Sequence, residues 1–549
     1  MKRLFLPAVL LSSLSAGAQL YIDNATFFID NGAVVTVQGD LTSTTNILVN
    51  GAAGTGKIRL GGTSAQIVNM NGNIVPNLEI DNTAGAVLGG AAKVSNTIVF
   101  TNGKISQGAY DLSLTSSAVA PSGTGLAAGT SYAVTNGTGA FKKELSAAPA
   151  SSVLLPVGTA TAYTPAAITL NGGTYNSSTY LAARAVPAPH PAKHPRSSDF
   201  LNNYWNLTNN IAGATISAVG NYVNPASVTG NQADIVSFTY NGSAWAKGAA
   251  QAATSITGAA VANGATDLYG MNKFILVSPK VFLQGAFDAN TGLMTDKLRN
   301  SGAYSVGAYP ASNIVPVSDP YRSAPYSASF SHVGNTIPET FSTNVLKDLA
   351  NPNDQIVDWV FVELREKSSN TVAPVLQTRS VLLQRDGDLV DVDGISPVYF
   401  KNLDPKATYV VSIRHRNHLG ISSNPASPLA LGLATAGFDF TNAGNTANIF
   451  GAAGTNYTQA GAVLKNVLWG GNSKHNTSSN WSGLNNDKDY LYITVLGSNS
   501  GVPVSGYSIG DLNLNRTANW SGLNNDKDFL YQKVLNSNSG VPRGQALPN

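Results

Sequence analysis

The sequence predicts a mainly β protein, and two features support this prediction. Short apolar runs alternate with turns rich in Gly, Asn and Thr, and few stretches show the 3.6-residue period of an amphipathic helix. Charged residues make up only 11% of the 549 residues, a balance that suits extracellular β-structure with many turns. The exception is a repeat near the C-terminal end, which we expect to form a small unit of loops and short helices.

Composition excludes several classes of chemistry and partner. The chain has no cysteine, so disulfides and cysteine-based catalysis or metal binding are excluded. The formal net charge is only +3, which is too small to favour nucleic acid as a partner. The sequence has no apolar run long enough to span a bilayer as a helix. We therefore expect no nucleic-acid partner and no transmembrane segment.

Residues 1–18 have the pattern of a secretory signal peptide. Lys2 and Arg3 form a basic start, an apolar run follows, and the small residues 16–18 form a cleavage site. The predicted mature chain begins at Gln19. We therefore expect a secreted protein that is extracellular or held at the outer cell surface.

Residues 19–140 have the pattern of a β-solenoid, with a sandwich as the alternative. Apolar runs of strand length recur with almost no helical period. Asn-Gly pairs beginning at Asn31, Asn50, Asn71 and Asn102 mark turns. Short strands on irregular turns suit coils that stack, although the imperfect repeat does not fix their number.

Residues 141–278 are expected to form a β-sandwich, because strand-length runs continue across hairpin turns. A stiff, solvated loop is expected over Val186–Pro195, which contains His190 and His194. Two histidines four residues apart form a zinc-binding face on a helix, but the prolines of this segment prevent a helix.

Residues 279–436 are expected to form a second sandwich, of the immunoglobulin or fibronectin type. Ile356–Arg365 is the strongest strand candidate in the chain, and Arg379–Gln384 and Tyr409–Arg416 are further strands. Long strands separated by such turns are typical of this architecture.

Residues 437–549 contain the repeat. Gly471–Pro503 recurs as Gly510–Pro542 at an offset of 39 residues, and 22 of the 33 aligned positions are identical. Each copy is predicted to be a polar loop followed by a short helix. In the second copy, Asn525 or Asp526 caps this helix. Its expected apolar stripe comprises Phe529, Leu530, Val534 and Leu535. We expect Trp481 and Trp520 to pack the two helices together.

The polar loop of the second copy has the spacing of a calcium loop. Oxygen-bearing side chains at positions one, three and five let a tight loop direct ligands at a hard cation. The predicted calcium ligands are Asp511, Asn513, Asn515, Thr517, Asp526 and Asp528. Arg516, however, stands where a glycine normally makes the bend. The alternative interpretation is that both loops are structural turns.

The first copy is altered at the ligand positions. Asn472 and Lys474 replace Asp511 and Asn513. We expect the ammonium of Lys474 to take the place of the ion by binding Asp487 or Asp489.

The repeat resembles the dockerin-like repeats that end many large secreted proteins of Bacteroidetes-type bacteria, often described as hemagglutinin-like or adhesin-like. The turn Trp520-Ser521-Gly522 and the tail Asn524–Asp528 carry the resemblance; the family has Tyr-Thr-Gly and Asn-Asn-Asp-Arg-Asp there. Strand sequences around Ile356–Arg365 and Tyr409–Arg416 resemble the module that precedes such repeats. The resemblance covers about half of the chain, and it implies calcium binding and a protein partner for residues 437–549.

One cluster of ionisable residues has a composition suited to catalysis. Its members are Asp386, Asp388, Asp391, Asp393, Arg414, His415 and His418. Carboxylates with histidine occur in hydrolase and metal sites, but Asp-Gly-Asp is common in turns and charged cross-strand clusters are usually structural. We therefore expect no catalytic residue here.

These features predict a non-enzymatic, secreted or cell-surface β-rich protein that serves adhesion or extracellular assembly. Its partner is expected to be a cell-surface or glycan ligand, or another copy of the chain. The alternatives are a carrier whose residues 437–549 dock to a cohesin-like partner, and a self-assembling fibre or sheath subunit of an extracellular filament. A glycan-active hydrolase is the remaining alternative.

Overall fold

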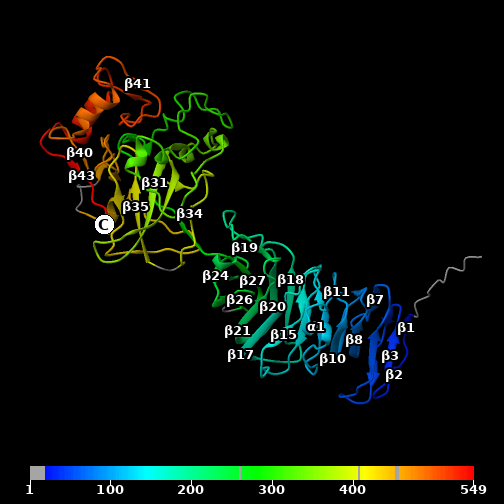
Figure 1. The fold of residues 1–549 in the computed structure, drawn as a ribbon. Helices are drawn as coiled ribbons and strands as arrows, with labels where there is room; N and C mark the ends of the chain where they lie inside the picture. Colours follow the sequence, from blue (N-terminus) through cyan, green and yellow to red (C-terminus); the bar gives the residue numbers. More distant parts are fainter. Residues whose placement is uncertain (1–18, 259–260, 406–407, 452–456) are drawn as a thin grey trace, which may run out of the picture. The chain divides into compact units, whose positions relative to one another are not determined.

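A computed structural model of the chain describes residues 19–258, 261–405, 408–451 and 457–549. The predicted signal peptide lies outside the described residues. The chain divides into two compact units between Lys273 and Phe274, coloured blue to green and green to red in Figure 1. Strands hold 38% of the chain and helices 8%, so the mainly β prediction is confirmed. Among the described residues, no helix has the length and apolar character needed to cross a membrane.

The first unit begins as a β-solenoid, one of the two architectures predicted for residues 19–140. Successive coils each add a strand to a growing parallel sheet (Figure 1). Neighbouring strands of the first face are parallel throughout. This face comprises β1 (Leu20–Ile22), β4 (Leu41–Ser43), β7 (Gln66–Asn69), β9 (Ala86–Leu88), β11 (Ile105–Ser106), β13 (Ala133–Val134) and β16 (Val157–Gly158).

The second face of the solenoid shows how the coils hold together. Its parallel strands are β3 (Val34–Val37), β6 (Lys57–Leu60), β8 (Ile74–Asp81), β10 (Ala92–Asn102), β12 (Leu112–Leu114) and β14 (Phe141–Glu144). Val37, Leu60, Ile80 and Phe100 stand in register in successive coils, and all four are buried. Each coil therefore covers the apolar side chains of its neighbour. The first two coils add a third face, the pair β2 (Phe27–Ile29) and β5 (Ile47–Val49), and α1 (Thr124–Ala127) follows β12.

The solenoid continues into an antiparallel sandwich through a shared sheet. β14 pairs in parallel with β12 and antiparallel with β18 (Tyr180–Val186). The sheet then extends through β20 (Tyr204–Asn209), β27 (Gly264–Asn272), β19 (Phe200–Leu201), β22 (Val228–Thr229), β23 (Ile235–Tyr240) and β24 (Trp245–Lys247), with η1 (Gln232–Asp234) before β23. The facing sheet comprises β15 (Val153–Leu155), β17 (Ala166–Thr174), β21 (Ala212–Asn221), β26 (Ser255–Gly258) and β25 (Ala250–Ala252). Trp205 is fully buried between the sheets, and a Cβ added to Gly220 would lie 2.8 Å from its ring.

The loop after β18 is not wholly solvated, contrary to the expectation for Val186–Pro195. His190 is only 4% exposed, and its Nε2 lies 2.9 Å from Asp267 Oδ2. The prolines do prevent a helix here, as expected. Aromatic side chains from distant strands surround His190, and these contacts could not be read from the spacing of the histidines.

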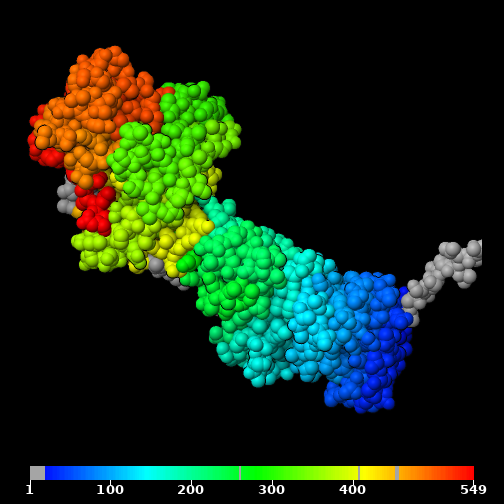
Figure 2. All heavy atoms as spheres, in the orientation of Figure 1, coloured from blue at the N-terminus to red at the C-terminus, as the bar shows by residue number. Residues whose placement is uncertain are grey.

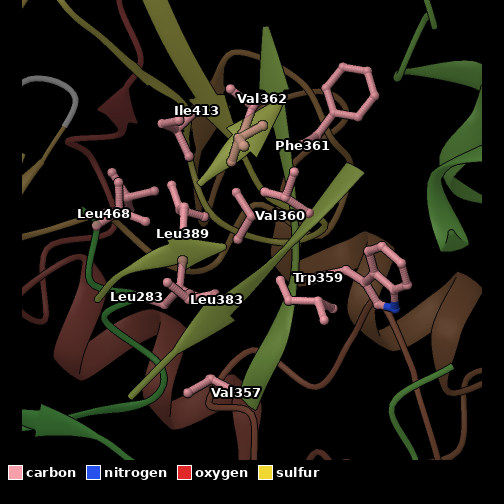
Figure 3. Close-up of a cluster of buried hydrophobic side chains, with 14 of the residues drawn as sticks. Leu283, Val357, Trp359, Val360, Phe361, Val362, Leu383, Leu389, Ile413 and Leu468 are labelled. Carbon is pink, nitrogen blue, oxygen red and sulfur yellow. The ribbon is translucent and has the colours of Figure 1, made fainter. Parts of the chain in front are cut away.

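The second unit is built on the strand that the sequence marks most clearly. β31 (Ile356–Glu366) lies between β32 (Val375–Gln384) and β35 (Thr408–Arg414), so all three predicted strands of this region are confirmed. β33 (Leu389–Val390), β36 (Ile421–Ser422) and β37 (Leu429–Ala430) complete the sheet. Ten of the eleven residues of β31 are buried, because both faces of the sheet are covered. Figure 3 shows Trp359 to Val362 with Leu383 and Ile413 of the flanking strands.

The second layer of this unit is smaller than a full immunoglobulin-like sheet. One part is the pair β28 (Phe274–Val277) and β34 (Val398–Lys401). The other is an irregular segment with the hairpin β29 (Phe287–Asp288) and β30 (Leu293–Met294) and the turns η2 (Pro320–Arg322), η3 (Tyr326–Ala328), η4 (Thr343–Leu346) and η5 (Pro352–Asp354). Tyr321 packs against Phe361 of the sheet at 5.5 Å between ring centroids. Buried Arg299 pairs with Asp296 and Asp348, which ties this segment together where strand ladders are short.

Candidate functional site: the duplicated repeat

The two copies of the repeat form one body by exchanging strands. β40 (Ser478–Ser479) of the first copy pairs with β43 (Arg543–Gly544), which follows the second helix. β41 (Val504–Ser505), which follows the first helix, pairs with β42 (Thr517–Ala518) of the second copy. The same 39-residue offset relates the two pairings, so the exchange is symmetric. η6 (Ala443–Asn448) and the hairpin β38 (Thr458–Ala460) and β39 (Lys465–Val467) precede this body.

Each copy contributes one short helix, as predicted. The helices are α2 (Asp487–Asp489) with η7 (Tyr490–Val495), and α3 (Asp526–Asp528) with η8 (Phe529–Val534). The side chain of Asn525 caps the second helix by accepting a hydrogen bond from Asp528 N at 2.7 Å. η7 and η8 are π-helical, and Leu535 N donates to Leu530 O at 3.1 Å. The predicted stripe is confirmed, with Phe529 packed against buried Leu530, Val534 and Leu535.

The tryptophans join the two helices, but each packs on the helix of the other copy. The ring centroids of Trp481 and Tyr531 are 4.6 Å apart, and those of Trp520 and Tyr492 are also 4.6 Å apart. The expectation that the tryptophans pack the helix pair is therefore confirmed. That the contacts cross between the copies has no signal in the sequence, because Tyr492 and Tyr531 are ordinary helix residues.

Two glycines allow the loops to approach the opposite helices. A Cβ added to Gly471 would lie 2.6 Å from Leu530 Cδ1, and one added to Gly510 would lie 2.6 Å from Val495 Cγ1. These glycines occupy equivalent positions in the two copies. Each loop therefore packs against the helix of the other copy at a distance that a larger side chain would prevent.

Each copy exposes a leucine at the tip of the turn before its helix. Leu484 is 95% exposed and Leu523 is 93% exposed. Both follow a glycine with positive φ and precede an asparagine with positive φ, so the backbone projects the leucine outward. Neither side chain contributes to a core, although both lie in the ten-residue run that the two copies share unbroken.

Two buried carboxylates lie in the loop of the second copy. Asp511 accepts hydrogen bonds from the backbone N–H groups of Asn515 and Arg516, both at 2.8 Å. Asp526 accepts from Leu512 N at 2.7 Å and from Asn519 N at 2.8 Å. Burial raises the pKa of Asp511, and burial together with the charge of Asp511 raises the pKa of Asp526 well above its usual range. A cation between the two groups would relieve this repulsion.

The amide groups around these carboxylates also fit a calcium ion. The buried Oδ1 atoms of Asn513 and Asn519 have no hydrogen-bond partner among the described residues, although buried oxygens normally have one. Arg516 adopts a φ of 88°, so the loop makes its bend without a glycine. Two carboxylates and two free amide oxygens suit calcium.

Three of the predicted ligands stand apart from this set. Asn515 Oδ1 accepts from Thr517 N at 3.1 Å, and Thr517 lies in β42. Asp528 pairs with the side chains of Asn525 and Lys527. In the described parts of the chain, no three His, Cys, Asp or Glu side chains converge as a metal-binding group.

The first copy satisfies the same loop without an ion. Asp487 accepts from Ser473 Oγ and the backbone N of Lys474, and Asn480 Oδ1 accepts from Asp487 N at 3.1 Å. Burial raises the pKa of Asp487 to about 7. The ammonium of Lys474 lies 5.6 Å from the ring centroid of Tyr490 rather than on a carboxylate. Asn480 Oδ1 therefore has the hydrogen bond that its equivalent in the second copy, Asn519 Oδ1, lacks.

The repeat packs on earlier residues of the second unit (Figure 2, orange and red against green and yellow). A buried charged network joins it to the β31 sheet. Tyr507 Oη donates to Asp358 Oδ1 at 2.7 Å, and Arg416 Nε donates to Asp358 Oδ2 at 3.0 Å. The Arg416 guanidinium lies 4.4 Å from the centroid of the Tyr507 ring. Asn417 Nδ2 donates to Asp511 O at 2.7 Å, which joins the network to the second loop. The sequence gives no sign that Asp358 and Tyr507 meet, because they are 149 residues apart.

His415 and His418 belong to this network. His415 Nε2 lies 3.1 Å from Asp358 Oδ2, and His418 Nε2 accepts from Gly285 N at 3.0 Å. Burial lowers the pKa of His415 and lowers the pKa of His418 well below its usual value. Both imidazoles are almost fully buried, at 2% and 1% exposure, so a substrate has no access to them.

The other members of the proposed cluster have separate partners. Lys280 lies 2.8 Å from Asp388 and 3.8 Å from Asp386. Asp391 pairs with Arg379, and Asp393 accepts hydrogen bonds from its own turn. Arg414 pairs with Glu363 at 3.2 Å. The sequence placed these residues near one another, but their side chains serve different parts of the fold.

We compared the chain with protein-family models, with curated proteins and with solved structures, and none of the three comparisons found a match. The resemblance to dockerin-like repeats therefore rests on the residues of the repeat alone, and it stays a prediction.

Leu530→Ala should destabilise the protein, whereas Leu523→Ala should not. Leu530 is fully buried against the first copy, so its truncation should lower the free energy of unfolding by about 2–5 kcal/mol. Leu523 is exposed, and its truncation should change that energy by less than about 0.5 kcal/mol. Urea unfolding followed by tryptophan fluorescence measures both, and equal effects would contradict the exchanged packing.

The buried histidines should make the second unit sensitive to acid. Their pKa values are lower in the folded than in the unfolded state, so their contribution is present above about pH 6.5 and is lost as pH falls below it. The free energy of unfolding, measured from pH 8 to 5, should fall less steeply in His418→Gln than in wild type. The two slopes should differ by up to about 1.4 kcal/mol per pH unit. The carboxyl groups whose pKa values burial raises, such as those of Asp511 and Asp526, change the stability in the opposite direction as pH falls. Wild type and variant share these groups, so their effect cancels in the comparison. Identical slopes would show that His418 does not titrate on unfolding.

Proposed function

We propose that this chain is a non-enzymatic, exported β-rich protein that serves adhesion or extracellular assembly, with the duplicated repeat as its attachment site. The observation that carries the proposal is the pair of leucines at equivalent tips, Leu484 and Leu523. Leucines this exposed bury almost no apolar surface in the fold, so we assign the two matching tips to contact with a partner. The predicted signal peptide supports export.

The surroundings of the two tips favour a protein partner. Each tip adjoins a half-buried tryptophan with a lysine over its ring, Lys488 at Trp481 and Lys527 at Trp520. Leu523 also borders a groove of about 680 Å³ that contains Phe287 and further apolar, amide and lysine side chains. Mixed aromatic and polar surfaces of this kind are typical of interfaces.

Two alternative functions use the same surface. A carrier would dock residues 437–549 to a cohesin-like partner, and a fibre or sheath subunit would bind another copy of the chain. A glycan-active hydrolase has less support, because the residues suited to catalysis are buried or paired.

We propose calcium as the cofactor of the second copy. Asp511 and Asp526 would hold the ion with the amide oxygens of Asn513 and Asn519, and the ion would supply the positive charge that two buried carboxylates require. The first copy would bind none, because Asn472 and Lys474 replace two of the ligands.

Charged substitutions at the tips should abolish attachment without unfolding the protein. Leu484→Asp with Leu523→Asp should reduce binding at least tenfold, because the leucines would no longer fit an apolar partner surface. Sedimentation velocity measures self-association, and binding of fluorescent protein to cells and to a glycan array measures adhesion. The melting temperature should stay within about 2 °C of wild type, since surface substitutions change little.

The matched control is Leu530→Ala, which disturbs the core and leaves both tips intact. Adhesion or association that persists in the double variant would refute the tips as the attachment surface. Release of sugar or peptide fragments by the pure protein would refute the non-enzymatic assignment.

Calcium should bind once, and the two copies supply the variants that test this. Asp511→Asn copies the residue found at position 472, so it should fold but lose calcium-dependent stabilisation, which reaches about 2.7 kcal/mol at one hundred times Kd. Isothermal titration calorimetry should give one site in wild type and none in this variant. Affinity should fall on acidification, because the carboxylates must lose protons. Asn472→Asp with Lys474→Asn should create a second site, and two sites in wild type would contradict the proposal.

A further inference from the structure

An aromatic cage surrounds His190 in the sandwich of the first unit. The centroid of its imidazole lies 4.8 Å from that of Tyr204, 5.1 Å from Tyr240, 4.8 Å from Trp245 and 5.7 Å from Tyr269. The four rings come from β20, β23, β24 and β27, which are neighbours in one sheet. The sheet therefore fixes their positions independently of the loop that carries His190.

A carboxylate completes the cage. Asp267 Oδ2 lies 2.9 Å from His190 Nε2, and Asn206 Nδ2 donates to Asp267 Oδ1 at 2.7 Å. Arg184 stands in register with Asn206 on the next strand. Electron-rich rings beside a carboxylate are the groups that bind organic cations in proteins.

The group that occupies the cage in this structure is uncharged. Ala192 N donates to His190 Nδ1 at 3.0 Å, so Nδ1 carries no proton and Nε2–H points at Asp267. A neutral imidazole donates a hydrogen bond to the carboxylate of Asp267. It carries no positive charge, so the attraction that four aromatic rings and a carboxylate exert on a cation contributes nothing to its binding. The cage is thus better suited to a ligand than to its own occupant.

The segment that carries His190, residues 187–196, is a strap that buries one side chain in the sandwich. His190 is the one buried residue among 187–196, all of which the structure describes. Trp245 Nε1 donates to Ala192 O at 3.1 Å, and Lys193 Nζ lies 4.3 Å from the centroid of the Phe200 ring. Removal of His190 from the cage would therefore uncover little apolar surface of the strap.

We propose that this cage is a binding site for a methylated ammonium group and that His190 closes it as an internal plug. The ligand class is a quaternary ammonium such as the choline head group. Its charge would face Asp267 while its methyl groups contact the four rings. Ligand entry displaces His190, so the strap lowers the apparent affinity of the wild-type protein. This site is independent of the attachment function proposed for the repeat.

His190→Ala tests the proposal on the chain from Gln19 to Asn549. Choline chloride is titrated by calorimetry and by tryptophan fluorescence. The variant should bind choline at least tenfold more tightly than wild type, because no plug must leave first. The neutral isostere 3,3-dimethylbutan-1-ol should bind at least tenfold more weakly than choline, and Asp267→Asn in the same background should lose at least tenfold. A folded His190→Ala protein that ignores choline, or that binds the neutral isostere equally, overturns the proposal.

A measurement on wild type keeps the proposal testable if His190→Ala does not fold. Saturating choline should raise the rate of trypsin cleavage after Arg196 at least threefold, because the strap leaves the cage, and the neutral isostere should not. An unchanged rate overturns the proposal. Flotation with phosphatidylcholine vesicles distinguishes the source of the ligand: binding assigns the site to lipid head groups, and binding of soluble choline alone assigns it to a small solute.

Discussion

The packing of each repeat copy on the helix of the other is the interaction on which the C-terminal body depends. Trp481 contacts Tyr531 and Trp520 contacts Tyr492, so neither copy has a complete core of its own. Strand exchange through β40 to β43 adds backbone hydrogen bonds to the same interface. A duplicated unit of this size cannot bury enough apolar surface alone, and pairing supplies what is lacking.

The symmetric fold holds two loops with different electrostatics. In the first copy, the backbone and Ser473 satisfy Asp487, and Lys474 points its charge at an aromatic ring. In the second copy, Asp511 adds a second buried carboxylate, and two amide oxygens have no partner. Two like charges in a buried site raise each other's pKa unless a cation offsets them. A few substitutions thus separate a self-satisfied turn from a site suited to an ion, while the apolar contacts stay the same.

The ionisable residues of the second unit mostly fasten the fold. Asp358, Arg416 and Tyr507 join the repeat to the β31 sheet, and the two buried histidines complete this network. Burying such groups is costly unless each has partners, and here the partners come from segments far apart in the chain. The two histidines that the sequence marked for catalysis are therefore buried, whereas the leucines at the two tips are exposed.

The sequence alone determined the mainly β class, the long strand Ile356–Glu366, the capped helices and the equivalence of the two copies, because these follow from local periodicity and from the repeat. It also marked Asp511, whose oxygens fall at the first position of a calcium-loop spacing, and Asp526, which follows later in the same loop. Only the tertiary structure decided that the copies exchange strands, that Asn519 joins the candidate ligands while Asp528 does not, and that His190 fills an aromatic cage. Those outcomes depend on contacts between residues distant in the chain, and a local pattern carries no record of which distant side chains will meet.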